Sequence, residues 1–256
     1  MAINMTISNY AAISLEDTAA DIVKKDYRTA AVFSHYGIEF CCGVRWPLSM
    51  VCEMKAIPAD DLFRQLQQAC RTIRVSNRLP FENWSIDFLA DYIIHVHHQY
   101  LKQFLPQVEQ QLEKFIEEHK KKYPDLAELG EGLRLLTKNM MPHLQQEEEI
   151  LFPYLRQVAH AYTSRESYAV LLIRTLRKPV ESIMQDEHSI IETLLNKFRS
   201  LTQYYTAPPN ACTSHRLSYS MLQELDDDLV QHLYLENGVL FPKAIAMEKE
   251  LLGQAS

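Results

Sequence analysis

The chain carries one pair of potential metal ligands twice, in nearly the same local sequence. Each copy has a histidine, a glutamate four residues later and then a Leu-Phe-Pro run: His143, Glu147 and 151–153 in the first, His232, Glu236 and 240–242 in the second. The offset is constant, since 232 − 143, 236 − 147 and 242 − 153 all equal 89. Residues four apart lie on one face of a helix, so each copy points an imidazole and a carboxylate in the same direction. Two such faces can hold two metal ions.

A further histidine precedes each copy at a similar distance. His98 lies 45 residues before His143, and His188 lies 44 residues before His232. Each is in an amphipathic segment with few helix breakers, so the pattern predicts a repeated pair of helices around a pseudo-twofold axis. His119, near the end of the first long segment, is the best candidate for a fifth imidazole.

The ligand types restrict the metal. Imidazole and carboxylate without thiolate suit iron, manganese or zinc, and two carboxylates spanning two ions favour a dinuclear centre over tetrahedral structural zinc. Ferritin-like di-metal proteins use Glu-x-x-His, and the chain contains no such tetrapeptide. The histidine-rich set is typical of the hemerythrin class instead.

The composition excludes several other classes of protein. The chain has 256 residues, 26 basic and 33 acidic side chains and a formal charge of −7, without a basic cluster interleaved with aromatics. We therefore expect no nucleic-acid partner. The chain has neither a basic start followed by an apolar run nor eighteen consecutive apolar residues, so we expect a soluble, cytoplasmic protein without a membrane partner.

The pattern of apolar residues predicts an all-α protein in two domains. Only six glycines occur, and sustained β-branched alternation is lacking. Residues 1–80 are expected to form a small helical domain with helices at 14–37, 47–55 and 59–71. Residues 81–256 are expected to form an up-down-up-down four-helix bundle with helices at 86–119, 125–160, 166–203 and 214–251.

Two local features of these helices can be read from capping and breaking residues. Ser14 and Asp17 resemble a capping box, Gly37 suits a left-handed C-terminal cap, and Ser85 can cap the first bundle helix. Pro153 and Pro242 each follow a repeated glutamate by six residues, where a proline either bends the helix or ends it. The sequence leaves both outcomes open.

Cys41 and Cys42 are the second unusual feature. The chain has five cysteines, an odd number that does not suit a secreted disulfide framework. Adjacent cysteines close only a strained ring, so thiolate exchange or transient metal capture is the chemistry open to them. The alternative is that they are two small buried residues at a turn.

Together these motifs resemble the repair-of-iron-centres family, the bacterial iron–sulfur cluster repair proteins with a hemerythrin-like bundle. The resemblance covers nearly the whole chain. It rests on 35–43, which contains Cys-Cys-Gly, on Asn83-Trp84-Ser85 and 92–98 at the start of the bundle, on 186–188, and on the two His-x-x-x-Glu copies with their Leu-Phe-Pro runs. One departure is Gly238, where asparagine is commoner in the family; glycine costs about 1 kcal/mol of helix stability.

The resemblance implies roles for individual residues. It implies two non-haem, carboxylate-bridged irons per chain, with Glu147 and Glu236 as the bridges and His98, His119, His143, His188 and His232 as terminal ligands. It implies the repair of clusters damaged by nitric oxide or peroxide, with damaged iron–sulfur proteins as clients and Cys41 and Cys42 in the transfer of iron.

Two other functions fit the same bundle. One is a carrier or sensor that binds nitric oxide or oxygen, and the other is an enzyme that reduces nitric oxide at the two irons. A pure carrier needs only the bundle and has no use for Cys41-Cys42, whereas an enzyme needs an electron donor and multiple turnover. The sequence leaves manganese, the client and the oligomeric state open, a homodimer included.

Overall fold

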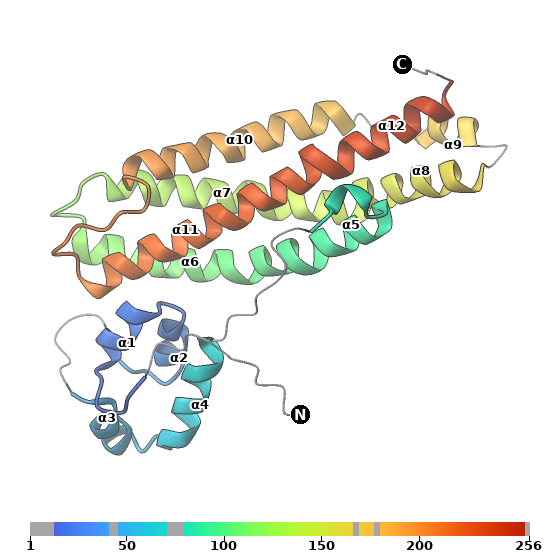
Figure 1. Cartoon of the computed structure of the whole chain (residues 1–256). Helices are drawn as coiled ribbons and strands as arrows, with labels where there is room; N and C mark the ends of the chain where they lie inside the picture. Colours follow the sequence, from blue (N-terminus) through green and yellow to red (C-terminus); the bar gives the residue numbers. More distant parts are fainter. Residues whose placement is uncertain (1–12, 41–45, 71–78, 166–168, 177–179, 254–256) are drawn as a thin grey trace, which may run out of the picture. The chain divides into compact units, whose positions relative to one another are not determined.

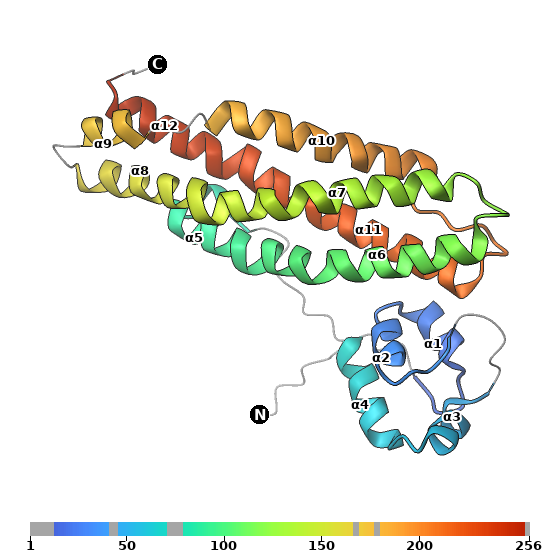
Figure 2. The same ribbon diagram turned by 180° about the vertical axis from the view of Figure 1, so that it is seen from behind.

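The computed structural model describes residues 13–40, 46–70, 79–165, 169–176 and 180–253 (Figures 1 and 2). Helices and their connections make up this part of the chain, with one isolated bridge between Thr18 and Pro47 and no strand, so the all-α prediction is confirmed. The chain divides into two compact units, residues 1–77 with 206–221 and residues 78–205 with 222–256. Among the described helices, none combines the length and apolar character needed to cross a membrane.

The N-terminal residues form short helices rather than the expected long first one. The helices of this module are α1 (Ala19–Lys25), α2 (Thr29–His35), α3 (Leu48–Lys55) and α4 (Ala59–Ala69). The prediction of one helix over 14–37 was wrong at both its start and its middle. Ser14 and Asp17 bond to each other in a turn, and Thr18 is the residue whose side chain caps α1. Gly37 has the expected left-handed conformation, with φ of 60°.

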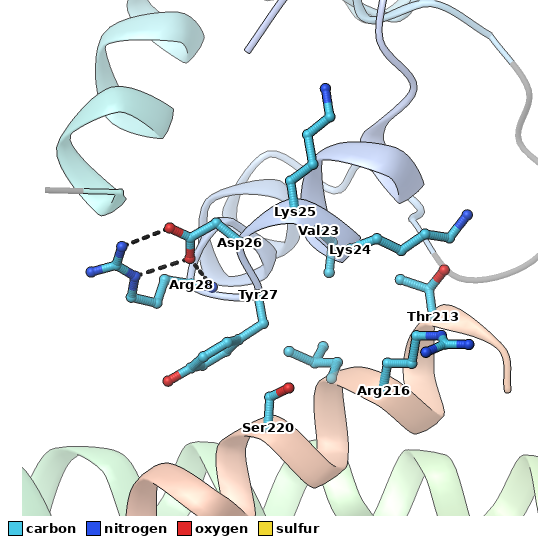
Figure 3. Close-up of a pocket in the computed structure, with 10 residues that line it drawn as sticks. Val23, Lys24, Lys25, Asp26, Tyr27, Arg28, Thr213, Arg216 and Ser220 are labelled. Carbon is cyan, nitrogen blue, oxygen red and sulfur yellow. Dashed lines mark hydrogen bonds and ion pairs between the residues drawn. The ribbon is translucent and has the colours of Figure 1, made fainter. Parts of the chain in front are cut away.

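Asp26 breaks the first predicted helix. Its backbone is extended, and its carboxylate accepts hydrogen bonds from the backbone N–H and the guanidinium of Arg28 (Figure 3). The Thr29 hydroxyl donates to the carbonyl of Asp26. Arg28 also donates to the carbonyl of Cys70 at the end of α4. A short acidic side chain that satisfies nearby backbone groups competes with the helix, which explains the break.

The larger unit is built on four long helical rods that run alongside one another (Figures 1 and 2). A 3₁₀ turn, η1 (Phe81–Asn83), precedes them. The first rod is α5 (Ile86–Tyr92), η2 (Ile93–His98) and α6 (Gln99–His119), and the second is α7 (Leu126–Gln146), η3 (Glu147–Leu151) and α8 (Phe152–Ser164). The third is α10 (Val180–Leu201), and the fourth is α11 (Thr213–Tyr234), η4 (Leu235–Leu240) and α12 (Phe241–Leu251). A short helix, α9 (Ala169–Leu176), packs against α8 and α12. Ser85 caps the first rod as expected, since its hydroxyl accepts from the N–H of Phe88. The up-down-up-down bundle is confirmed.

Three of the rods contain a short π-helical segment, and these are η2, η3 and η4. The N–H of Phe152 donates to the carbonyl of Glu147, and the N–H of Phe241 donates to that of Glu236, so each bond closes a wider turn of i to i−5. The next residue in each case is proline, which has no N–H to restore the regular pattern at once. Both helices continue through the proline, so neither ends there. Such segments are frequent at functional sites.

The repeated Leu-Phe pairs belong to the apolar core of the bundle. Leu151, Phe152, Leu240 and Phe241 are buried together with residues of α5, α8 and α12. The repeat therefore encodes part of the packed core as well as polar residues at the centre of the bundle. Burial of each of these side chains contributes about 1.5–3 kcal/mol.

Candidate metal centre

Six of the predicted ligands meet at the middle of the bundle. They come from all four rods: His98 ends η2, His143 is on α7, Glu147 begins η3, His188 is on α10, His232 is on α11 and Glu236 is in η4. All six are buried, and His98, His232 and Glu236 have no exposed surface. The bundle thus brings together side chains that are up to 138 residues apart, since 236 − 98 = 138.

The six side chains form two groups that share both carboxylates. His98 and His232 form one group with the two glutamates, and His143 and His188 form the other. Within each group the potential ligand atoms lie within 4.8 Å of one another. Each group takes one histidine from each half of the repeat, as a pseudo-twofold axis requires.

Glu236 has the geometry of a bridge between the groups. Its Oε1 lies 2.9 Å from Nε2 of His232, and its Oε2 lies 3.5 Å from Nε2 of His188. Glu147 faces both groups as well, with Oε2 at 3.4 Å from Nε2 of His98 and Oε1 at 4.0 Å from Nε2 of His188. The two carboxylates therefore lie between two pairs of imidazoles.

Hydrogen bonds on the outer ring nitrogens hold two of the imidazoles. Nδ1 of His98 lies 2.9 Å from Oε1 of Glu148, and Nδ1 of His188 lies 2.9 Å from Oδ1 of Asn237. Lys102 donates to both carboxylate oxygens of Glu148, at 2.7 and 2.8 Å. Both partners can accept, so each ring can carry its proton on Nδ1 and direct Nε2 toward the centre, where Nε2 of His98 lies 3.1 Å from Nε2 of His232.

Aromatic rings close the site on the side of the repeated Phe residues. Phe152 stacks on His98 with ring centroids 5.6 Å apart, and Phe241 stacks on His188 at 6.3 Å. These two phenylalanines are related by the 89-residue offset, since 241 − 152 = 89. The phenylalanine of each Leu-Phe-Pro run therefore packs against an imidazole of the site.

Burial and neighbouring groups shift the pKa of three side chains at the site. Burial opposes ionisation of Glu236, but His232, His98 and His188 outweigh it and hold the pKa of Glu236 well below its usual value. Burial lowers the pKa of His188, although Glu236 and Asn237 favour its protonated form. The pKa of Glu148 is also lowered, because the hydrogen bonds from Lys102 and His98 exceed the effect of its burial.

These features fit a metal ion. Nε2 of His188 is buried without a hydrogen-bond partner among the described residues, and it faces two carboxylate oxygens at 3.5 and 4.0 Å. When both are ionised, the two buried carboxylates carry negative charge that is costly without a cation. Nitrogen and carboxylate oxygen are ligands that iron, manganese and zinc all accept.

The structure does not bring His119 to this centre, which corrects its assignment as a ligand. His119 is the last residue of α6, and 119 − 98 = 21 residues separate it from His98 along one continuous rod. At 1.5 Å per residue this is about 30 Å, too far for both to bind one centre. Its ring packs on Phe115 instead. Cys41 and Cys42 fall outside the described residues.

Sequence reasoning missed Glu148, Asn237 and Lys102. A signal for the first two was present, because they directly follow the repeated glutamates and share their offset, 237 − 148 = 89. The residue types differ, so a search for identical residues passes over them. Lys102 has no counterpart in the repeat, and only the packing of α6 against η3 could reveal it.

The fold and the site define a protein of the hemerythrin class, a four-helix bundle with histidines and carboxylates at its centre. Residues 89–244 match the family model described as Hemerythrin HHE cation binding domain, and residues 15–70 match one described as Domain of Unknown function (DUF542). Proteins named Iron-sulfur cluster repair protein YtfE are similar over most of their length. The one from Cronobacter sakazakii is 31% identical over 226 residues, which cover 87% of this chain and 93% of that protein. The one from Salmonella paratyphi B is 31% identical over 225 residues, covering 86% and 93%. The chain belongs to this family of iron–sulfur cluster repair proteins.

Proposed function

We propose that this chain repairs iron–sulfur clusters damaged by nitrosative or oxidative stress, and that it does so by supplying iron from a di-iron centre. The observation that carries the proposal is the pair of His₂ groups that share Glu147 and Glu236. The names of its relatives support cluster repair as the use of such a centre. In this proposal the metal ligands are the six side chains that meet in the bundle.

Bound iron would supply a redox-active metal that can be exchanged. The chain's own residues would orient and cover the imidazoles that bind it. His98 and His188 keep Nε2 free to bind because Glu148 and Asn237 accept their Nδ1 protons. Phe152 and Phe241 cover these rings and exclude water from them. A carboxylate has two oxygens and can move from two partners to one without leaving its helix, which allows metal to leave without unfolding the bundle.

Iron content tests the ligand assignment. After anaerobic reconstitution we expect about two irons per chain in the wild type, as each shared-carboxylate group provides one position. His98→Ala should lose most of this iron. His95→Ala is the matched control, since His95 lies in the same segment η2 but is exposed. His119→Ala should also keep its iron. Less than one iron in the wild type, or loss in His119→Ala equal to that in His98→Ala, contradicts the assignment.

A repair assay tests the use of the iron. The loaded chain should reactivate an iron–sulfur enzyme that nitric oxide has damaged, and Glu236→Gln should not. We further propose that Cys41 and Cys42 pass iron to the client, since thiolates bind iron and exchange with cysteines. The Cys41→Ser/Cys42→Ser variant should keep its iron and repair more slowly. Full repair by this variant rejects the transfer role, and nitrous oxide formation over many turnovers with no reactivation favours a reductase.

A further inference from the structure

The two halves of the centre differ at one pair of equivalent positions. His98 and His188 occupy corresponding places in the repeat, and each donates its Nδ1 proton at 2.9 Å. The acceptor for His98 is the carboxylate of Glu148, whereas the acceptor for His188 is the neutral amide of Asn237. The symmetry of the ligands is therefore broken by the residues behind them.

The charge on Glu148 is fixed by its surroundings. Lys102 on α6 contacts both of its oxygens at 2.7 and 2.8 Å, so the carboxylate is held as an anion with its own counterion. Hydrogen bonds to ionised acceptors are about twice as strong as those to neutral ones. A stronger bond at Nδ1 moves electron density toward Nε2 and makes His98 a better metal ligand than His188.

Several other features of the two positions are matched. Both positions share Glu147 and Glu236, and both have a second histidine four residues before a glutamate. A phenylalanine from the repeated Leu-Phe-Pro stacks on each of the two unequal imidazoles, with interplanar angles of 24° and 28°. The difference between Glu148 and Asn237 is therefore not offset by the stacking or by the shared ligands.

We propose that Glu148 and Asn237 are positioning residues that make the two metal positions unequal. The His98–His232 position retains its ion, and the His143–His188 position is the one that releases iron first. The proposal rests on the di-iron function above and adds to it which of the two ions is given up. Repair then delivers one iron per chain while the other keeps the four rods together.

The rate of iron release from the loaded full-length chain tests the proposal. An excess of an iron(II) chelator should remove iron from the wild type in two phases of equal size. Glu148→Gln keeps the shape of the side chain and removes its charge, so it should speed the slow phase by about ten- to hundredfold. Asn237→Asp adds the missing charge at an exposed position and should slow the fast phase. Glu149→Gln, an equivalent change on the exposed face next to Glu148, should alter neither phase.

Mössbauer spectra of the same samples loaded with ⁵⁷Fe give a readout independent of repair. The wild type should show two unequal iron signals, which approach each other in Glu148→Gln. The Asn237→Asp variant keeps the test available if Glu148→Gln fails to fold. Release in a single phase from the wild type, or an effect of both variants on the same phase, overturns the proposal. If the wild type releases iron in a single phase but still repairs clusters, the proposed function stands and only this inference fails. If the wild type shows two unequal irons but does not repair clusters, this inference is supported and the proposed function is contradicted.

Discussion

At the scale of single residues, the six candidate ligands that meet in the bundle were easier to find from the sequence than the residues behind them. A metal ligand must be a residue such as histidine or glutamate, and it must lie on the same helix face as its partner. The 89-residue repeat preserves both the residue types of His143 and Glu147 and their spacing of four. A supporting residue only has to accept a hydrogen bond, which both glutamate at 148 and asparagine at 237 can do although they differ in charge. His119 lies on the same rod as a ligand but has no counterpart in the repeat, and two matched halves already supply four imidazoles without it.

Asp26 gives a prediction at this scale that depends on pH. Burial opposes ionisation of its carboxyl, but the hydrogen bonds from Arg28 outweigh burial and lower its pKa. A carboxyl whose pKa is lowered on folding stabilises the fold above its unfolded pKa of about 3.9, and loses this contribution as pH falls through the folded value. Asp26→Asn should therefore reduce the free energy of unfolding of the N-terminal module by about 1 kcal/mol at pH 7, and by progressively less below about pH 4.

Urea unfolding followed by tryptophan fluorescence can measure this. The chain has two tryptophans, and in a Trp84→Phe background only Trp46 of the module remains. Glu53→Gln, an exposed change on α3, is the control and should have no effect at either pH. An equal loss of stability from Asp26→Asn at pH 7 and below the folded pKa contradicts the role given to its charge.

At the scale of elements, helical segments were predictable and their interruptions were not. The apolar spacing in the bundle located the four rods, because each buries an apolar face in the part of the chain that the structure describes. The break at Asp26 depends on Arg28 and Cys70, and Cys70 is 44 residues away from Asp26 in the sequence. The π-helical segments likewise depend on bonds such as that from Phe152 to Glu147, which no periodicity indicates.

Two glycines test how tightly the rods are packed. A Cβ at Gly132 on α7 would lie 2.7 Å from the ring of Phe198, which is buried, so Gly132→Ala should destabilise the bundle by about 1–3 kcal/mol. A Cβ at Gly238 in η4 would meet only the ring of Tyr234 at 3.1 Å. Tyr234 is 52% exposed and can move away.

Gly238→Ala should therefore raise stability by up to about 1 kcal/mol, the difference in helix propensity. Thermal unfolding of both variants, followed by circular dichroism, measures the two effects together. A lower melting temperature for Gly238→Ala would mean that the π-helical turn at this position needs glycine.

At the scale of the whole molecule, the centre links all four rods through the ligands on η2, α7, η3, α10, α11 and η4. Metal that binds only the folded bundle stabilises it by about 2.7 kcal/mol when the free ion is at one hundred times its dissociation constant. Removal of metal by a chelator should lower the melting temperature of the full-length chain in calorimetry.

The Glu147→Gln/Glu236→Gln variant is the matched control for this measurement. It should lose the response to the chelator, and without metal it should be more stable than the metal-free wild type, because two buried negative charges are gone. If the metal-free wild type is as stable as the loaded protein, the carboxylates are not the groups that the metal neutralises.

The repeat also implies that a similar centre could be assembled from two separate chains. Two copies of a single helical hairpin could assemble the same cage of four imidazoles and two carboxylates, each contributing half. Such an assembly would carry the same residue behind both outer imidazoles, and its two ions would be interchangeable. Because both hairpins are covalently joined here, position 148 can be glutamate while position 237 is asparagine. Joining the halves would then allow one ion to be kept and the other to be given away, as we propose above.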